Sequence, residues 1–183
     1  SATSEDSSDW VALFDGTSLD GWTQKNGTAT YEVSNGTIVG KTSERSPNSF
    51  LCTNKIYQDF DLEFEVKVDK GLNSGVQIRS KTREASIGDS NNEKAGRVIG
   101  PQVEIVEGDS GSLSGYIWRE ATGDGWMISK GDPAAHTHFK GGEWNKYRIL
   151  AEGPRIRTWI NGNMVEDVTD KETQKDFPQG FIG

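Results

Sequence analysis

Polar side chains that could hold a sugar recur at every second position of three segments. These segments, residues 60–69, 74–80 and 101–107, alternate apolar and polar residues, which is the pattern of a half-buried strand. Their polar positions carry carboxylates, amides, a lysine and a guanidinium: Glu63, Glu65, Lys67, Gln77, Arg79, Gln102 and Glu104. If the three strands pair side by side, these groups form one patch whose planar donors and acceptors suit sugar hydroxyls. The alternative is an ordinary solvated sheet face, where mixed charges are common.

Aromatic residues follow this region on two short segments. Tyr116 and Trp118 belong to an expected strand at residues 116–120, and Trp126 lies in a glycine-rich loop. Tyrosine and tryptophan rings stack on the apolar CH faces of pyranose rings, so these three residues are candidate platforms for a saccharide. Their alternative role is packing in the core, where tryptophan is common.

Candidate metal ligands are sparse. His136 and His138 would share one face of an extended segment, a spacing found in metal sites, but no third ligand lies nearby in sequence. Surface histidines are the alternative. Loop aspartates could hold Ca²⁺, although their spacing is not that of an EF-hand: Asp109, Asp124 and Asp132. No cofactor is therefore assigned, and a divalent metal, Ca²⁺ or a transition metal, is left open.

The single cysteine, Cys52, excludes an internal disulfide. It lies in an apolar, strand-like run, residues 49–53, and is expected to be a small core residue. A nucleophilic role would require a neighbouring base, and neither histidine is close in sequence.

The overall composition indicates one acidic domain rich in strands. Helical patterns are scarce in the 183 residues, whereas glycine and tryptophan are plentiful, which favours a β-sandwich or barrel. The net charge of −8, with no basic tract, argues against a nucleic-acid partner. No apolar run approaches the roughly 18 residues of a membrane span. Residues 1–9 are small and polar and are expected to be a disordered spacer left after export, which predicts a secreted, periplasmic or cell-surface protein.

Six further stretches, in this order, resemble one known family. They are residues 13–22, 57–65, 73–79, 142–148, 159–162 and 180–183. Together they resemble the 3-keto-disaccharide hydrolase domain family, formerly described only as a domain of unknown function, over residues 10–183. The resemblance implies a single all-β domain: a two-sheet antiparallel jelly-roll sandwich of the concanavalin A-like lectin and glucanase type, with a concave sheet that holds carbohydrate. Relatives continue beyond the position of Gly183, so the sequence either lacks a last strand or is a fragment.

The resemblance also implies cleavage of a glycosidic bond in a sugar oxidised at C3, or a related glycoside. A 3-keto group acidifies the C2 proton, so elimination and hydration require a base, an acid and a group that stabilises an enolate. These roles fall to Glu104 as base, Glu65 as acid or orienting group, and Arg79 as the oxyanion partner, which a metal could replace. Substrate-binding residues are expected to be Asn73, Gln77, Gln102, Tyr116, Trp118, Trp126 and His138.

Two departures leave alternatives open. Family members carry an acidic residue and a glutamine two apart on one strand, and Gln102 and Glu104 are in the reverse order, so which of them acts is open. The Glu-x-Asp-x-x-Glu motif of the glucanases is missing, which disfavours retaining hydrolysis. A non-catalytic, lectin-like module of a larger secreted or cell-surface protein is the first alternative, because one fold serves both functions. A plain interaction domain is the second.

Overall fold

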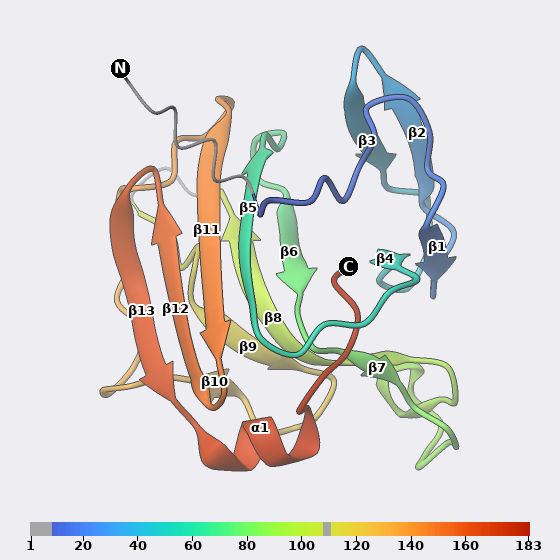
Figure 1. Ribbon diagram of the computed structural model, residues 1–183. Helices are drawn as coiled ribbons and strands as arrows, with labels where there is room; N and C mark the ends of the chain where they lie inside the picture. Colours follow the sequence, from blue (N-terminus) through green and yellow to red (C-terminus); the bar gives the residue numbers. More distant parts are fainter. Residues whose placement is uncertain (1–8, 108–110) are drawn as a thin grey trace, which may run out of the picture.

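The computed structural model describes residues 9–107 and 111–183 (Figure 1). Residues 1–8 of the expected spacer, and the metal candidate Asp109, lie outside the described residues. Two antiparallel sheets pack face to face, which confirms the predicted two-sheet sandwich. No helix within the described parts of the chain is both long and apolar enough to cross a bilayer.

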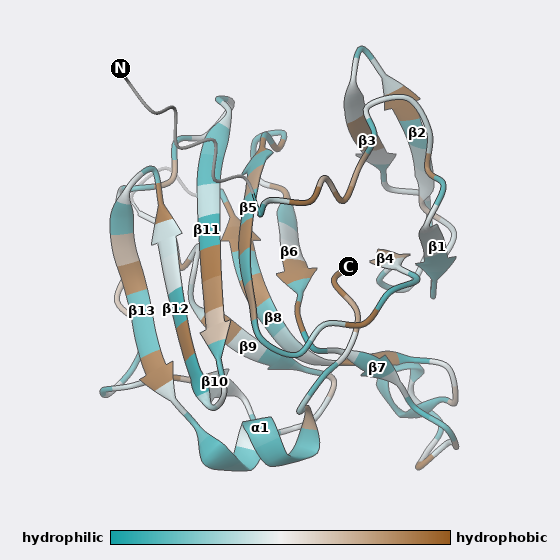
Figure 2. Cartoon of the chain, in the orientation of Figure 1, coloured by the Kyte–Doolittle hydropathy of each residue, from teal (hydrophilic) through white to brown (hydrophobic). Residues whose placement is uncertain are grey.

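The first sheet has four strands in the order β13-β12-β11-β5. Their bounds are β5 (Phe60–Val66), β11 (Asn145–Glu152), β12 (Arg155–Ile160) and β13 (Asn163–Thr169). β11 and β12 form a hairpin with Gly153 and Pro154 at its turn, and Glu152 pairs with Arg155 across it. Figure 2 shows apolar and polar residues alternating along these strands, as a sheet with one buried face requires.

The second sheet has five strands, in the order β10-β9-β8-β6 with β7 also pairing with β8. Their bounds are β6 (Asn73–Gln77), β7 (Lys81–Thr82), β8 (Val98–Val106), β9 (Ile117–Glu120) and β10 (Trp126–Met127). Between β7 and β8 the chain forms a long loop, interrupted by the 3-10 turn η1 (Asn91–Glu93).

Two small strand pairs lie beside the sandwich. One is β1 (Trp22–Lys25) with β4 (Phe50–Thr53), and the other is the hairpin β2 (Thr30–Ser34) with β3 (Thr37–Lys41). Asn35 and Gly36 at its turn have φ angles of 50° and 73°, the left-handed values that a type I′ turn requires. Asn-Gly is the residue pair that most favours this turn, so the local sequence accounts for the hairpin.

One short helix, α1 (Lys171–Asp176), was not predicted. Asp170 caps it by accepting a hydrogen bond from the backbone N–H of Thr173 at 3.0 Å. Six residues are too few to show a helical period, so only the cap could have signalled it.

The core fills the space between the two sheets. Ile78, Val103 and Ile117 from the five-stranded sheet are fully buried, as are Tyr147 and Ile149 from the four-stranded sheet. A second cluster, Phe50, Cys52, Val98 and Phe181, packs β4 onto the end of the five-stranded sheet. Burial raises the pKa of the Cys52 thiol to about 12, so this cysteine is the expected core residue and carries no thiolate at neutral pH.

The three polar segments do not pair side by side as hypothesised. β6 pairs with β8, but β5 pairs with β11 in the other sheet. Period-two alternation fixes which residues share a face of a strand, but it does not fix which sheet the strand joins.

Candidate carbohydrate site

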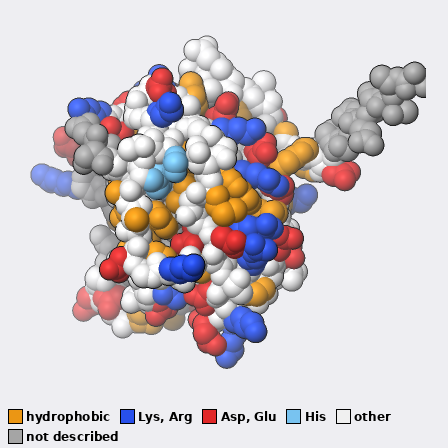
Figure 3. All heavy atoms as spheres, turned by 90° about the vertical axis from the view of Figure 1, so that its left-hand side faces the viewer, with side chains coloured by type: hydrophobic (Ala, Val, Ile, Leu, Met, Phe, Trp, Pro, Cys, Tyr) orange, Lys and Arg blue, Asp and Glu red, His pale blue; other side chains and the backbone are white. Residues whose placement is uncertain are grey.

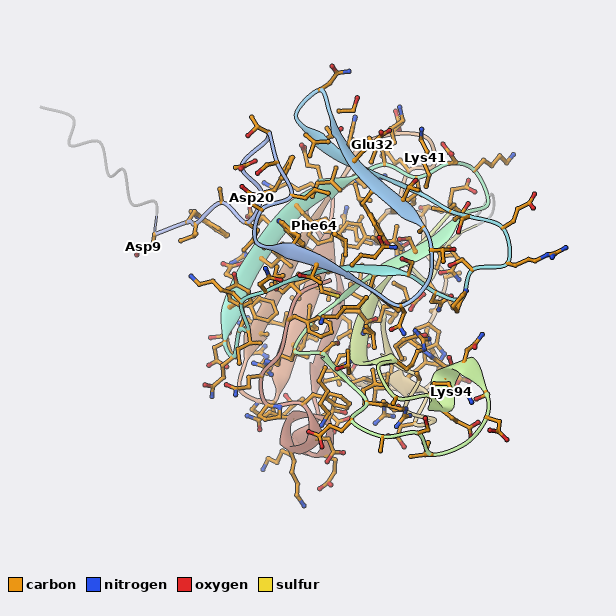
Figure 4. The ribbon with its side chains drawn as sticks, turned by 90° about the vertical axis from the view of Figure 1, so that its right-hand side faces the viewer. Asp9, Asp20, Glu32, Lys41, Phe64 and Lys94 are labelled. Atoms are coloured by element: carbon orange, nitrogen blue, oxygen red, sulfur yellow. The ribbon has the colours of Figure 1, made fainter. Side chains whose placement is uncertain are left out.

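A cleft of about 1060 Å³ lies between the five-stranded sheet and the segment that contains the β2–β3 hairpin. Its floor carries Gln102 and Glu104 from β8, and the opposite wall includes Tyr31 and residues 37–43. Figure 4 shows the labelled Glu32 and Lys41 on the hairpin, seen from that side of the molecule. The two strands of this hairpin pair only with each other within the described residues.

Glu104 is the most enclosed acid in the cleft lining, with 7% of its surface exposed. Strand alternation turns Val103 and Ile105 into the core and leaves Gln102 and Glu104 on the cleft face. Burial raises the pKa of Glu104 to about 7, and the negative charge of Glu120 adds to this, while a hydrogen bond from Gln102 opposes it. The carboxyl group is therefore close to half ionised at neutral pH, which suits proton transfer.

Gln102 fixes the orientation of Glu104, because its Nε2 donates a hydrogen bond to Oε1 of Glu104 at 2.7 Å. Gly75 on β6 is paired in register with Glu104 and makes room for this amide. A Cβ at residue 75 would lie 2.6 Å from Cγ of Gln102 and 2.7 Å from its Nε2. A side chain at this position would therefore displace the Gln102 amide from its present place.

Three tryptophans line the cleft, two of them predicted. Trp118 on β9 and Trp126 on β10 are paired in register, and their rings meet edge to face with centroids 5.0 Å apart. Trp144, which immediately precedes β11, was not predicted and is 54% exposed at the cleft lining. Large aromatic faces beside polar groups are what stacking of a sugar ring requires. Asn73, at the start of β6, also lines the cleft as expected.

Glu120 is a second carboxylate in the cleft that the sequence reasoning missed. Nη2 of Arg97 donates to its Oε1 at 2.6 Å, and Nδ2 of Asn48 donates to the same oxygen at 3.3 Å. The alternation of β9 could have revealed it, because Glu120 lies two residues after Trp118 and so shares its face. Asn48 and Arg97 come from distant loops, and no pattern in the sequence points to them.

Five predicted residues lie outside the cleft lining: Glu65, Arg79, Gln77, Tyr116 and His138. Glu65 is exposed on β5 in the other sheet, opposite Lys146 of β11. Arg79 is buried and donates to the carbonyl oxygens of Gln58 at 2.5 Å and Gly153 at 2.6 Å, and to Asp59 at 2.9 Å. Its φ of 45° turns the chain just after β6, so strand alternation does not carry its side chain to the cleft face.

Gln77 is also outside the cleft lining, although it shares a strand with Gly75. It is fully buried, and its Nε2 donates to Oγ of Ser80 at 2.9 Å and to the carbonyl oxygen of Gly100 at 3.3 Å. Its backbone also pairs with Gly183, so this end of β6 is covered by the last residues of the chain.

The histidines and Tyr116 form a separate cluster. The rings of His136 and His138 stack with centroids 4.8 Å apart, and Tyr116 lies against His136 at 6.1 Å. Figure 3 shows the histidine side chains on the face of the molecule away from the hairpin. Nε2 of His136 contacts the carbonyl oxygen of Ser114 at 2.7 Å, and its Nδ1 accepts from the backbone N–H of His138 at 3.2 Å. These contacts occupy both nitrogens of His136.

In the described ranges, no three His, Cys, Asp or Glu side chains gather closely enough to hold a metal ion. Asp124 and Asp132 therefore belong to no such group of three possible metal ligands within the described residues. The candidate site combines the enclosed carboxylates Glu104 and Glu120 with amides and aromatic rings.

Comparison with known proteins gives a family and a fold. Residues 9–183 match the family described as the 3-keto-α-glucoside-1,2-lyase-like domain. A candidate glycosyl hydrolase from Parabacteroides distasonis has a similar structure, with a TM-score of 0.60 and 19% identity, over 94% of this chain and 85% of that chain. The carbohydrate-binding module CBM66 from Bacillus subtilis follows with a TM-score of 0.53 and 17% identity, over 89% and 85%. No curated protein matches the chain significantly. At these identities the two structures establish the fold alone.

Proposed function

Because the chain belongs to the family of 3-keto-α-glucoside-1,2-lyase-like domains, as its motifs predicted, we propose that it cleaves the glycosidic bond of a 3-keto-sugar in this cleft. The observation that carries the proposal is Glu104. It is a nearly buried carboxyl group with a pKa of about 7, held by Gln102 on a sheet face beside aromatic rings. A poised base next to a stacking surface is what removal of a sugar C–H proton requires.

Glu104 acts as the base in an elimination. Its carboxylate takes the proton from C2, which the 3-keto group acidifies, and the freed electron pair forms a double bond between C1 and C2. The bond from C1 to the glycosidic oxygen breaks, and that oxygen keeps the bonding pair and takes a proton from solvent to become an alcohol, while Glu104 releases the C2 proton to solvent. Addition of water across the double bond then gives the free 3-keto-sugar.

Negative charge develops on the 3-keto oxygen during this step, and the cleft offers donors for it. Asn73 and Lys67, whose side chains end in an amide and an ammonium group, both belong to the cleft lining. Donors placed at a developing oxyanion lower the barrier more than donors that contact the ground state. Arg79 and Glu65 lie outside the lining and have no role in the proposal, and no step passes through a metal ion.

The test is product formation from 3-keto-trehalose and methyl 3-keto-glucoside. We expect Glu104→Gln to lower kcat/KM by at least about 100-fold, because general base catalysis contributes roughly 10²- to 10⁴-fold. Glu65→Gln, the same change on the other sheet, is the matched control and should retain activity within about twofold. Equal loss in both variants, or no loss in either, would contradict the role of Glu104. A parallel assay with a chelator shows whether a metal contributes.

A carbohydrate-binding module is the second candidate, and the three tryptophans of the cleft favour it. Such rings would bind a saccharide in the absence of any chemistry. Saccharide binding measured by calorimetry, together with no turnover of either 3-keto-sugar by the wild type, would select this function.

A further inference from the structure

Glu120 combines two properties that a residue with a purely structural role would not need. It lines the cleft beside Trp118, yet only 12% of its side-chain surface is exposed, and it is held by an ion pair to a still more buried arginine, Arg97. Burial of an ion pair is costly and is weak evidence for a contribution to stability. Stability alone therefore does not explain why this buried ion pair lies at the cleft wall, and a role in ligand binding does.

The two oxygens of Glu120 differ. Oε1 accepts both protein hydrogen bonds, from Arg97 and from Asn48. Oε2 accepts none from the described residues, and it is not among the fully buried polar atoms that lack a partner. It is therefore accessible, and the cleft is the space that this residue lines.

Arg97 holds the carboxylate in place and does not itself line the cleft. Its Nε donates to Oδ1 of Asn92 at 3.1 Å, and its guanidinium group lies over the ring of Phe50, 5.3 Å from the centroid. With Nη2 bound to Glu120, three contacts in different directions fix the arginine. The orientation of Glu120 follows from them, so a ligand finds the acceptor already in place.

We propose that Oε2 of Glu120 accepts a hydrogen bond from a hydroxyl group of the bound sugar ring and makes the cleft specific for sugars that carry this hydroxyl. The inference rests on the proposed function and deepens it. A hydrogen bond to a charged acceptor is short and strong. A site built to bond a hydroxyl group also rejects the analogue that lacks it, because its own polar group is then left without a partner. Arg97 is the positioning residue.

The experiment compares substrates and variants together. Wild type and Glu120→Gln are assayed on methyl 3-keto-glucoside and on its 4-deoxy and 6-deoxy analogues. We expect the wild type to lose about 10- to 100-fold in kcat/KM on one analogue, the range of a hydrogen bond to a charged group. Glu120→Gln should lose a similar factor in kcat/KM on methyl 3-keto-glucoside, mainly through a higher KM. Its kcat/KM values for this substrate and for the deoxy analogue should then differ less than threefold.

Glu166→Gln is the control, because Glu166 is even more buried than Glu120 but lies on β13 away from the cleft lining. It should discriminate between the sugars as the wild type does. If Glu120→Gln fails to fold, Glu120→Asp keeps the charge while withdrawing the carboxylate, and it should show the same loss of discrimination.

Equal discrimination by wild type and both Glu120 variants, or none by the wild type, would overturn the proposal. The proposed function fails separately, if the wild type turns over none of these sugars. In that case calorimetric affinities for trehalose and its deoxy analogues test the same contact of Glu120.

Discussion

The two sheets both present polar residues on their outward faces, yet the two faces differ in what those residues do. On the four-stranded sheet, charged groups of neighbouring strands pair with one another at exposed or half-exposed positions. The cross-strand pairs are Lys146–Glu63, Arg148–Asp61, Arg155–Asp167 and Arg157–Glu152. Their hydrogen-bonding capacity is largely used within the sheet.

On the five-stranded sheet, Glu104 and Glu120 are almost buried and both line the cleft. Gln102 and Arg97 orient them, and three tryptophans belong to the same cleft lining. An alternating polar face is thus no sign of a site by itself. The cleft face is distinguished by two nearly buried acids, each oriented by a hydrogen bond from a neighbouring side chain.

Among changes that leave both acids of the cleft in place, the largest effect is expected at Gly75, where the missing side chain makes room for Gln102. In Gly75→Ala the new Cβ collides with the Gln102 side chain, so the hydrogen bond to Glu104 is lost. We expect kcat/KM on a 3-keto-glycoside to fall by about 10- to 100-fold, as for a hydrogen bond to a charged group. An unchanged kcat/KM with an intact fold by circular dichroism would show that Gln102 does not orient the base.

The next effect concerns stability and pH. The pKa of Glu104 in the folded state, about 7, lies above the ordinary value of 4.5, so the folded state binds the proton more tightly than the unfolded state. Its contribution is complete below about pH 4.5 and is lost as the pH rises through 7. Glu104→Gln removes this dependence, and we expect the variant to be more stable than wild type by about 3 kcal/mol at pH 8.5, and about equal at pH 4.5.

Urea unfolding at the two pH values measures this difference. Glu65→Gln, on the exposed face, should show no such gain at pH 8.5. A gain of the same size in both variants would trace the effect to net charge and not to burial of Glu104.

A smaller effect is expected from the third tryptophan. Trp144→Ala removes an exposed ring from the cleft lining and should weaken saccharide binding by about tenfold, because one aromatic contact contributes about 1 kcal/mol or slightly more. Trp10→Ala is the control, since Trp10 is 53% exposed but lies outside that lining. Calorimetry with a 3-keto-disaccharide measures both affinities. Equal affinities for the two variants would show that Trp144 does not contribute to saccharide binding.

The smallest effect is expected on the other sheet. Asp167→Asn breaks an ion pair with Arg155 whose side chains are 37% and 47% exposed. Exposed pairs contribute about 0–1 kcal/mol, so the free energy of unfolding should fall by less than about 1 kcal/mol with activity unchanged. A loss of activity here would contradict the contrast between the two faces.

Much of the fold was accessible from the sequence because strands and turns are local. The alternation of residues 60–69 and 101–107 located β5 and most of β8, and Asn35-Gly36 located the hairpin. The site was predicted in part: Gln102, Glu104, Asn73, Trp118 and Trp126 line the cleft, whereas Glu65, Arg79, Gln77, Tyr116 and His138 do not. The missed residues, Asn48 and Arg97, meet Glu120 only because two distant loops converge on β9.

The sequence by itself determined the strands, the faces of each strand and the family, since these depend on residue order and period. Tertiary structure alone decided which strands share a sheet. β5 joined β11, which separated Glu65 from Glu104, because pairing depends on contacts between residues far apart in the chain. It also decided which acids are buried, and burial is what separates the pKa of Glu104 from that of an ordinary glutamate.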